Sequence, residues 1–334
     1  MTNVALFSAR PDFARSLAHI TEETYNEYNV DIFSQNQSIN WRMMKFLSRN
    51  YDIIQVDELI RNGIMGSMLA TLCSIPLVSF IRGWDYYLNE HKEYKHIHEK
   101  TISIRAEYTL KNTDHTLFIS EVCREKICRE FPVGSSSVVG RPFEIAKYEP
   151  ASVDLEIPRP PYQIFTATNL RYQSKARGVN IIIEALEPLF GEYDIEYSIA
   201  GDGRATHLVN KYAEDISKKS QINLLGFRED IPNLLSQADL FIYVSFLDAL
   251  PMAVLEAEAS GLPVIAGGTS GVSEAAGTAA IICPPTAEGI RDTVRFLLEE
   301  PERLIAKSNA SLQRMESYNQ NAVDGFVSAW ESVL

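Results

Sequence analysis

The sequence predicts an α/β protein made of two doubly wound, Rossmann-like domains, and three observations support this. Short apolar runs typical of buried parallel strands alternate with stretches of helical periodicity along the whole chain. The 334 residues suffice for two ordinary domains, and a hydrophobic content of 46% can fill two cores. The stretch 144–160, rich in Pro and charge, interrupts the alternation and indicates a hinge, together with residues 138–140.

The first half shows five strand patterns, each an apolar run rich in β-branched or aromatic residues, with helical patterns between them and after the last one. The predicted strands are 4–7, 30–33, 51–56, 76–81 and 115–119, and the predicted helices are 10–28, 41–49, 63–73, 105–111 and 121–131. Ser120 is the expected N-cap of the last helix, because its hydroxyl can accept from a first-turn N–H. Residues 1–150 are therefore predicted to form the N-terminal domain.

The second half repeats the alternation and then ends in helices. The predicted strands are 163–167, 196–200, 222–225, 240–244, 263–266 and 279–283, and the predicted helices are 178–189, 206–217, 231–237, 251–260, 285–298, 301–317 and 321–333. We assign 151–315 to the second domain and 316–334 to a C-terminal helix that packs back on the first. Ligands of such folds bind outside the carboxyl ends of the strands, so a cleft between two facing domains is expected.

Composition excludes several classes of protein. A net charge of −13 argues against a general nucleic-acid or anionic-membrane partner, although a local basic pocket remains compatible with it. No window has the long uncharged apolar run of a membrane span, and the N-terminus lacks the pattern of a signal peptide. The four cysteines form no C-x-x-C pair, which favours reduced thiols in a cytosolic protein.

The stretch 244–266 is the most informative part of the chain. It indicates a strand end, a turn, a short helix opened by Pro251, a glycine stop at Gly261 and another strand. The helix is apolar almost all round, as in a buried helix, yet it carries Glu256 and Glu258. A buried carboxylate needs a hydrogen-bonding partner, and the helix supplies no Lys or Arg. A ligand diol such as a ribose would fit; the plainer interpretation is a solvated Glu, with Asp248 as a capping residue.

The start of this helix is a candidate anion site. N–H groups near residues 249–253 have no partner inside the helix, and the helix dipole favours a phosphate at the same place. A second candidate lies in N-L-R-Y-Q-S-K-A-R-G, a predicted loop that holds Arg171, Lys175 and Arg177 in an acidic chain. Guanidinium groups can bind phosphate oxygens in a fork, whereas the plainer interpretation is a solvated loop.

The segment V-S-F-L-D-A-L-P-M-A-V-L-E-A-E-A-S-G-L-P-V resembles the E-x7-E region of retaining GT-B glycosyltransferases, especially glycosyltransferase family 4. Y-S-I-A-G-D-G-R, the run 222–245 and G-G-T-S-G-V-S-E resemble further motifs of that family, so the resemblance covers the whole second half. The first half matches more loosely, through Y-D-I-I-Q-V and P-L-V-S-F-I-R-G-W-D.

The resemblance implies roles for individual residues of the second half. Glu256 matches the acid that binds the ribose of the nucleotide sugar, and Asp248 matches the acid beside the transferred sugar. Arg171 and Arg177 match the two cations that hold the diphosphate, with Lys175 as a rival for the second role. The remaining substrate-binding candidates are Gly201, Gly203, Arg228, Ala249, Leu250, Pro251 and Met252.

Plainer interpretations stay open for several of these positions. Gly201 and Gly203 form a G-x-G of the kind that turns use constantly, and Arg228 is equally compatible with a surface loop. The loop with Gly267, Gly268, Gly271 and Glu274 lies near the donor in the family but is also an ordinary glycine turn.

The chain departs from the family pattern at several points. Asp248 stands where the family has Glu, Ala249 where it has Gly, and Arg177 where it commonly has Lys. In the first half Arg82 and Asp85 match a substrate-binding H-G-x-D, with Arg in place of His, and S-A-R-P-D replaces the glycine-rich loop. The three histidines between residues 91 and 98 could suit a metal, but their Glu and Lys neighbours favour a solvated helix.

The sequence therefore predicts a cytoplasmic retaining glycosyltransferase that takes a sugar from a nucleotide-diphosphate sugar donor. The resemblance implies no metal and no cofactor, and by analogy a glycan or lipid-linked acceptor, which would bring the protein into peripheral contact with a membrane. The alternatives are an inactive GT-B-like nucleotide-sugar binding or scaffold protein, supported by the substitutions at Arg82 and Asp248, and a sugar-nucleotide epimerase. A phosphorylase is disfavoured, because the chain has no motif for a Lys-anchored cofactor.

Overall fold

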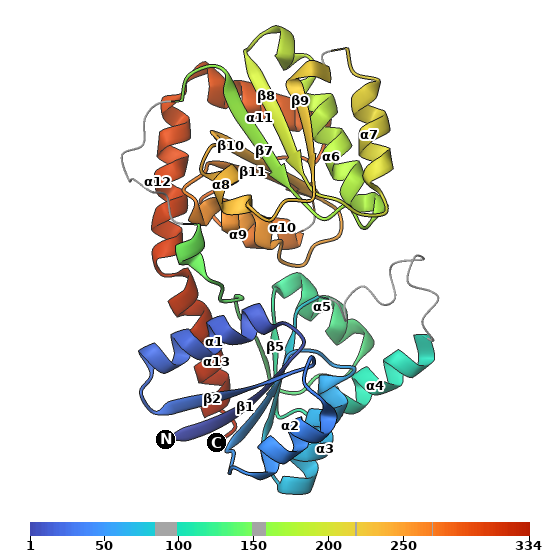
Figure 1. Ribbon diagram of the computed structural model, residues 1–334, viewed down its shortest axis with the longest axis vertical. Helices are drawn as coiled ribbons and strands as arrows, with labels where there is room; N and C mark the ends of the chain where they lie inside the picture. Colours follow the sequence, from blue (N-terminus) through green and yellow to red (C-terminus); the bar gives the residue numbers. More distant parts are fainter. Residues whose placement is uncertain (84–98, 149–157, 218, 269) are drawn as a thin grey trace. The chain divides into compact units, whose positions relative to one another are not determined.

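A computed structural model describes residues 1–83, 99–148, 158–217, 219–268 and 270–334 (Figure 1). The chain divides into two compact units: unit 1 is Met1–Phe143 with Ser317–Leu334, and unit 2 is Glu144–Glu316. The first boundary therefore lies seven residues before the predicted one, and the C-terminal helix belongs to unit 1. Each unit contains a six-stranded sheet with helices on both of its faces (Figure 1).

Unit 1 has the strand order β2-β1-β3-β4-β5-β6, and all of its strand pairs are parallel. Its strands are β1 (Thr2–Ser8), β2 (Tyr28–Ser34), β3 (Ile53–Val56), β4 (Leu77–Ile81), β5 (His115–Phe118) and β6 (Ser136–Val138). Its helices are α1 (Pro11–Thr24), α2 (Ile39–Leu47), α3 (Asn62–Cys73), α4 (Glu99–Lys111), α5 (Glu121–Glu130) and α13 (Tyr318–Glu331). The short edge strand β6 was not predicted, because S-S-V carries little apolar signal and we assigned Val138 to the hinge.

The predicted N-cap of α5 is confirmed: the Ser120 hydroxyl accepts a hydrogen bond from the Cys123 N–H at 3.3 Å. The bond satisfies one first-turn donor that has no partner inside the helix. Among the described residues no helix has the length and apolarity needed to cross a bilayer.

The C-terminal helix α13 supplies part of the core of unit 1. Phe326 and Trp330 are fully buried, and Phe326 packs against Phe13 of α1 and Phe80 of β4 with ring centroids 5.9 and 4.9 Å apart. The Trp330 indole Nε1 donates to Gln55 Oε1 of β3 at 2.8 Å, so both buried polar groups are satisfied. Residues 275 positions apart in the sequence therefore share one core.

Unit 2 has the order β12-β11-β10-β7-β8-β9, again with parallel pairs. Its strands are β7 (Tyr162–Ala167), β8 (Ile195–Ala200), β9 (Ile222–Gly226), β10 (Leu240–Ser245), β11 (Val264–Gly268) and β12 (Ile281–Ile282). Its helices are α6 (Gln173–Leu186), α7 (Thr206–Glu214), α8 (Ile231–Leu235), α9 (Met252–Ala259), α10 (Ser270–Ala276), α11 (Ala287–Glu299) and α12 (Glu302–Glu316). The two units together have the GT-B fold that the sequence predicts.

Both sheets reverse their strand order next to the first strand of the unit. In unit 1 the reversal lies between β1 and β3, and in unit 2 it lies between β10 and β7. The segments that leave the carboxyl ends of two such strands turn to opposite faces of the sheet, which opens a place for a ligand between them. The residues after β7 and β10 are those that the sequence singles out.

The start of α6 was predicted wrongly. The helix begins at Gln173, five residues before the predicted start, so Lys175 and Arg177 lie on its first turns and not in a loop. Gly178 is inside the helix because the helix packs closely on β10: a Cβ at Gly178 would lie 2.0 Å from the Val244 carbonyl oxygen. We placed this glycine at the start of the helix, whereas it lies inside the helix and permits the approach of helix to strand.

We expect the replacement Trp330→Ala to lower the free energy of unfolding of unit 1 by about 3–5 kcal/mol, since it removes a buried indole and leaves Gln55 without its donor. Hydrogen exchange of the β1 and β3 amides measures this free energy without interference from unit 2. Trp41→Ala, which removes a half-exposed indole from α2, is the control and should change it by less than about 1 kcal/mol. Equal effects of the two substitutions would contradict the assignment of α13 to the core.

Candidate functional site

The candidate site lies at the carboxyl ends of β7 and β10 in unit 2, where the strand order reverses. The turn after β7 carries Arg171, and the first turns of α6 carry Lys175 and Arg177. The segment after β10 carries Asp248 and leads into α9. The fold thus brings together two groups of residues that are about seventy positions apart in the sequence.

A buried ion pair joins the two segments. Lys175 is only 3% exposed, and its ammonium group forms an ion pair with the Asp248 carboxylate. The Tyr243 hydroxyl of β10 accepts from Lys175 Nζ at 2.6 Å and donates to Asp248 Oδ2 at 2.7 Å. The three groups form a closed network, so the low polarity of the surroundings strengthens each interaction.

The network keeps Asp248 ionised. Burial by itself raises the pKa of this carboxyl group, but the Lys175 ammonium and the hydrogen bonds from Lys175, Ser245 and Tyr243 outweigh it, so the pKa lies below its ordinary value. The side chain remains partly exposed while Lys175 does not. A fixed negative charge therefore stands at the carboxyl end of β10.

The three predicted cations have different surroundings. Arg171 and Arg177 are exposed at the surface of the site, and the Arg177 guanidinium lies over the Phe246 ring at 4.4 Å from its centroid. Such stacking holds a guanidinium in place while leaving its edge N–H groups able to bind an anion. Lys175, in contrast, is buried against Asp248.

Glycines bring the loops of the site close together. A Cβ at Gly201 would lie 1.9 Å from the Thr168 carbonyl oxygen, and one at Gly203 would lie 2.5 Å from the Arg171 nitrogen. Both glycines, which follow β8, therefore allow the segment that carries Arg171 to pack against them. Their approach to a ligand stays a prediction, and the structure shows that they also approach the chain itself.

Helix α9 begins at Met252, with Pro251 as the N-cap residue in extended conformation and without a side-chain cap. Asp248, which would be a capping residue in the plainer interpretation, binds Lys175 and Tyr243 instead. As in any helix, the N–H groups of Met252 and Ala253 have no acceptor inside α9. Ala249 and Pro251 are buried, and Leu250 and Met252 are half-buried. Gly261 has the predicted left-handed conformation, with φ of 73°.

Only one of the two glutamates of α9 is fully buried. Glu258 is the fully buried acid, and its partner is Arg314 of α12, which donates to Glu258 Oε2. Glu256 is half-buried. The need for a ligand to satisfy a buried acid therefore does not arise at Glu258, because tertiary structure supplies a cation from 56 residues further along the chain.

The structure also places the remaining predicted residues of unit 2. Gly271 of α10 packs on the same segment, since a Cβ there would lie 2.5 Å from the Asp248 carbonyl oxygen. Glu274 is half-buried on that helix. Arg228 is exposed after β9 and forms a fork with Asp230, at 2.8 Å from Nε to Oδ1 and 2.6 Å from Nη2 to Oδ2. This surface pair matches the plainer interpretation of Arg228.

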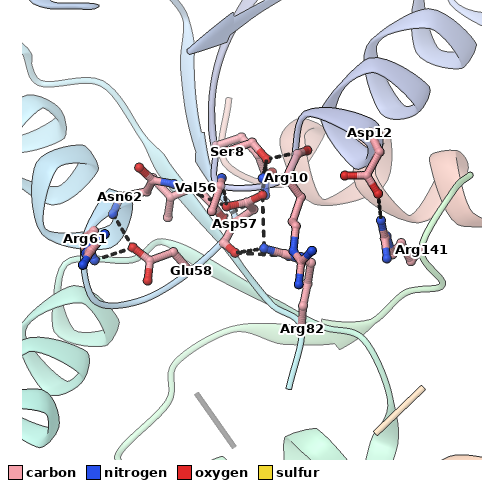
Figure 2. Close-up of polar contacts among 12 residues, drawn as sticks. Ser8, Arg10, Asp12, Val56, Asp57, Glu58, Arg61, Asn62, Arg82 and Arg141 are labelled. Atoms are coloured by element: carbon pink, nitrogen blue, oxygen red, sulfur yellow. Dashed lines mark hydrogen bonds and ion pairs between the residues drawn. The ribbon is translucent and has the colours of Figure 1, made fainter. Parts of the chain in front are cut away.

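Unit 1 has its own polar cluster at the point where the strand order reverses (Figure 2). Asp57, directly after β3, is buried; it accepts from the Ser8 hydroxyl and from the Ala9 N–H at 3.0 Å. Arg82, directly after β4, donates to the Asp57 carbonyl oxygen at 3.2 Å and lies 3.4 Å from its carboxylate. Arg82 is thus tied to the end of β3, and Asp85 lies outside the described residues, as do the three histidines.

Sequence reasoning missed three polar partners, of which only Tyr243 belongs to the Lys175–Asp248 network. Tyr243 is a polar-tipped residue in an otherwise apolar strand, which could have indicated a hydrogen bond at the strand's end. Asp57 follows its strand directly, the position from which side chains reach the edge of a parallel sheet. Arg314 gave no signal, because nothing local marks a helical arginine as the partner of an acid on another helix.

Several known proteins are similar to this chain in sequence or in fold. Residues 161–300 match the model of a protein family described as glycosyl transferases group 1. An Escherichia coli protein named UDP-Gal:alpha-D-GlcNAc-diphosphoundecaprenol alpha-1,3-galactosyltransferase is 27% identical over 263 residues, covering 73% of this chain and 64% of that protein. The phosphatidylinositol N-acetylglucosaminyltransferase GPI3 subunit of Saccharomyces cerevisiae is 24% identical over 183 residues, covering 50% of this chain and 38% of its own. The chain thus spans less than two thirds of either relative.

The solved structures show the same fold. The crystal structure of Anabaena HepE in complex with UDP superposes with a TM-score of 0.74 at 15% sequence identity, covering 100% of both chains. At this identity the likeness concerns the fold alone.

Stability should fall as pH rises from about 5 to 8, because burial raises the pKa of Glu258 to about 8 against the partial opposition of Arg314. The folded protein then binds a proton that the unfolded chain releases above its ordinary pKa, so folding is favoured at the acid end of this window. The melting temperature across it measures the effect.

Glu258→Gln keeps a neutral side chain of the same shape and should flatten this part of the profile. The control Glu299→Gln changes an exposed acid at the end of α11 and should leave the slope as it is. A slope that survives in the Glu258→Gln protein would show that other groups produce it.

Proposed function

We propose that this chain is a glycosyltransferase that uses a nucleotide-diphosphate sugar, since residues 161–300 match the family model described as glycosyl transferases group 1. The observation that carries the proposal is the arrangement at the carboxyl ends of β7 and β10: two exposed arginines, a helix start and an ionised Asp248. These are the groups that the transfer of a sugar from a diphosphate requires, because negative charge develops on the leaving group and positive charge on the sugar.

The two arginines and α9 would stabilise the leaving diphosphate. Arg171 and Arg177 supply guanidinium N–H groups, and Met252 and Ala253 supply main-chain N–H groups at the positive end of the helix dipole. Fixed donors aimed at developing charge lower the barrier without reorganisation during the reaction. Arg177, held over Phe246 at 4.4 Å, is the better positioned of the two.

Asp248 would act on the sugar, with Lys175 as the residue that positions it. The Lys175–Tyr243 pair fixes the carboxylate and keeps it ionised, so it can accept from sugar hydroxyls or stabilise the oxocarbenium-like centre. Lys175 is therefore assigned to Asp248 and not to the diphosphate. Retention of the anomeric configuration and the absence of a metal are proposed from the resemblance to family 4.

Glu256 would bind the ribose, on the match of its position to the second acid of the E-x7-E region. A uracil nucleotide is the proposed donor, because the name of the bacterial relative includes UDP-Gal and HepE was solved with UDP. A lipid-linked acceptor is proposed on the same ground, since the bacterial and the yeast relative both carry a lipid in their names. Arg228 is left as a candidate neighbour of the base.

Lys175→Met should lower kcat and move the acid limb of its pH profile to higher pH, because Asp248 loses the cation that depresses its pKa. Arg177→Met should lower kcat/KM by about 100-fold or more, since it removes a contact to the leaving group, and the acid limb of the pH profile should stay at the same pH. Steady-state kinetics with UDP-sugars between pH 4.5 and 8 separate the two effects.

Lys175→Met leaves a buried carboxylate unpaired and is expected to destabilise the fold. The double variant Lys175→Met with Asp248→Asn restores a neutral pair, so it should fold, and it should lack the acid limb that the single variant only shifts. An unchanged limb in the single variant, with folding verified by circular dichroism, would place Lys175 on the phosphate after all.

Glu256→Ala should weaken binding of a UDP-sugar by about 10- to 100-fold, the range for loss of a charged hydrogen-bond acceptor. A thermal-shift panel of UDP-, GDP- and ADP-sugars identifies the donor and measures this loss. The control Glu299→Ala should bind as the wild type does. Undiminished binding by Glu256→Ala would remove the ribose assignment, and donor binding without turnover would favour an inactive binding protein.

A further inference from the structure

Helix α2 of unit 1 buries Phe46 in the core but exposes four of its six large apolar side chains, which departs from the usual pattern of a surface helix. Its outward side carries Ile39, Trp41, Met44 and Leu47, of which Met44 is 72% and Leu47 70% exposed. Its inward side buries Arg42, which is 8% exposed and whose Nε has no hydrogen-bond partner. A surface helix normally turns its apolar stripe inward and its charges outward. The outward side of α2 therefore has the composition of a surface that is covered by an apolar partner.

The neighbouring helix α3 extends this apolar surface. Met68 is 53% and Leu72 77% exposed on its outer side. Both helices cover the same face of the sheet, since Phe46 of α2 and Leu69 of α3 belong to one core cluster (Figure 1). Six of the fifteen large apolar residues that are exposed in the described part of the chain lie on these two helices. We call the six, residues 39, 41, 44, 47, 68 and 72, the α2–α3 face.

The charge around the α2–α3 face differs from that of the chain as a whole. The chain has 44 acidic and 31 basic residues, yet residues 35–51 contain no Asp or Glu and residues 62–81 contain no charged residue at all. Residues 35–51 hold Arg42, Lys45 and Arg49, and Lys45 Nζ lies 5.7 Å from the centre of the Trp41 ring. Charges beyond about 10 Å are largely screened at ordinary salt, so the local balance decides what this face attracts.

We propose that the α2–α3 face docks on a phospholipid bilayer that contains anionic lipids. Isolated protruding Met, Leu and Ile side chains can enter the acyl boundary, and a Trp with basic neighbours fits the headgroup level. The absence of carboxylates from both helices reduces the repulsion that the net charge of the chain would otherwise cause. The face is independent of the donor site of unit 2, so this inference goes beyond the proposed transfer reaction.

A second copy of this chain is the main competing occupant, because an apolar face can also dimerise. The charge pattern favours the bilayer. A copy of this chain would present the same uncharged or basic face, whereas an anionic bilayer complements it. Lys45 and Arg49 share one carboxylate, that of Asp31, at 2.9 Å and 2.5 Å, so the three groups are held together and keep a net positive charge. The two occupants make different predictions in solution.

Sedimentation of the full chain with vesicles tests the proposal without donor or acceptor. We expect binding to vesicles of phosphatidylcholine with phosphatidylglycerol and weaker binding to phosphatidylcholine alone. Met44→Glu and Leu47→Glu, each alone, should reduce binding at least about tenfold, since each replaces an inserted apolar group by a carboxylate. Phe296→Glu is the matched control: it also places a carboxylate at a half-exposed apolar position of a helix, but on α11 of unit 2.

The outcomes separate the bilayer from the alternatives. Loss of binding in the two α2 variants and not in Phe296→Glu, with unchanged thermal unfolding, supports the proposal. Failure of the wild type to sediment with either vesicle overturns it. Concentration-dependent dimerisation of the wild type that Leu47→Glu abolishes, without vesicle binding, assigns the face to a second copy. Glycosyl transfer enters none of these measurements, so failure of the proposed reaction would not change their result.

Discussion

The ion pair between Lys175 and Asp248 is the interaction on which the candidate site depends. It joins the start of α6 to the segment between β10 and α9, the two parts of unit 2 that leave the sheet where its strand order reverses. Gly178 makes the pair geometrically accessible, because it lets α6 approach the carbonyl end of β10. An anionic group on a rigid strand end, with exposed arginines beside it, is the result.

Unit 1 connects the ends of its strands through a different set of polar residues. Ser8 and Asp57 bind each other at the point where its strand order reverses, and Arg82 fastens the ends of β3 and β4 together (Figure 2). Where the resembling family has a glycine-rich loop and a histidine, this chain has a tied polar cluster. The donor-binding chemistry that we propose therefore rests on unit 2, while unit 1 carries the face that we assign to the bilayer.

The acidic residues of α9 show how far local reasoning reaches. An apolar helix with two glutamates does indicate that one of them is buried with a partner, and this is confirmed. That reasoning identifies neither which acid is buried nor which residue is its partner. Arg314 lies on α12, and no pattern within α9 indicates it. The surface of α2 is a similar case: the sequence shows that residues 35–51 contain no Asp or Glu, but only the folded chain shows which apolar side chains of α2 face outward.

The sequence by itself determined the fold class, the positions of nearly all strands and helices, and the residues that gather at the edge of the second sheet. The elements follow from periodicity, which is a local property of the sequence. The gathering of residues follows from topology, because parallel strands present their carboxyl ends at the same edge of a sheet. Tertiary structure alone decided the partners: Lys175 with Asp248, Glu258 with Arg314, Trp330 with Gln55. Each pair joins residues more than fifty positions apart, and only the packing of one element on another brings their charges and dipoles within reach.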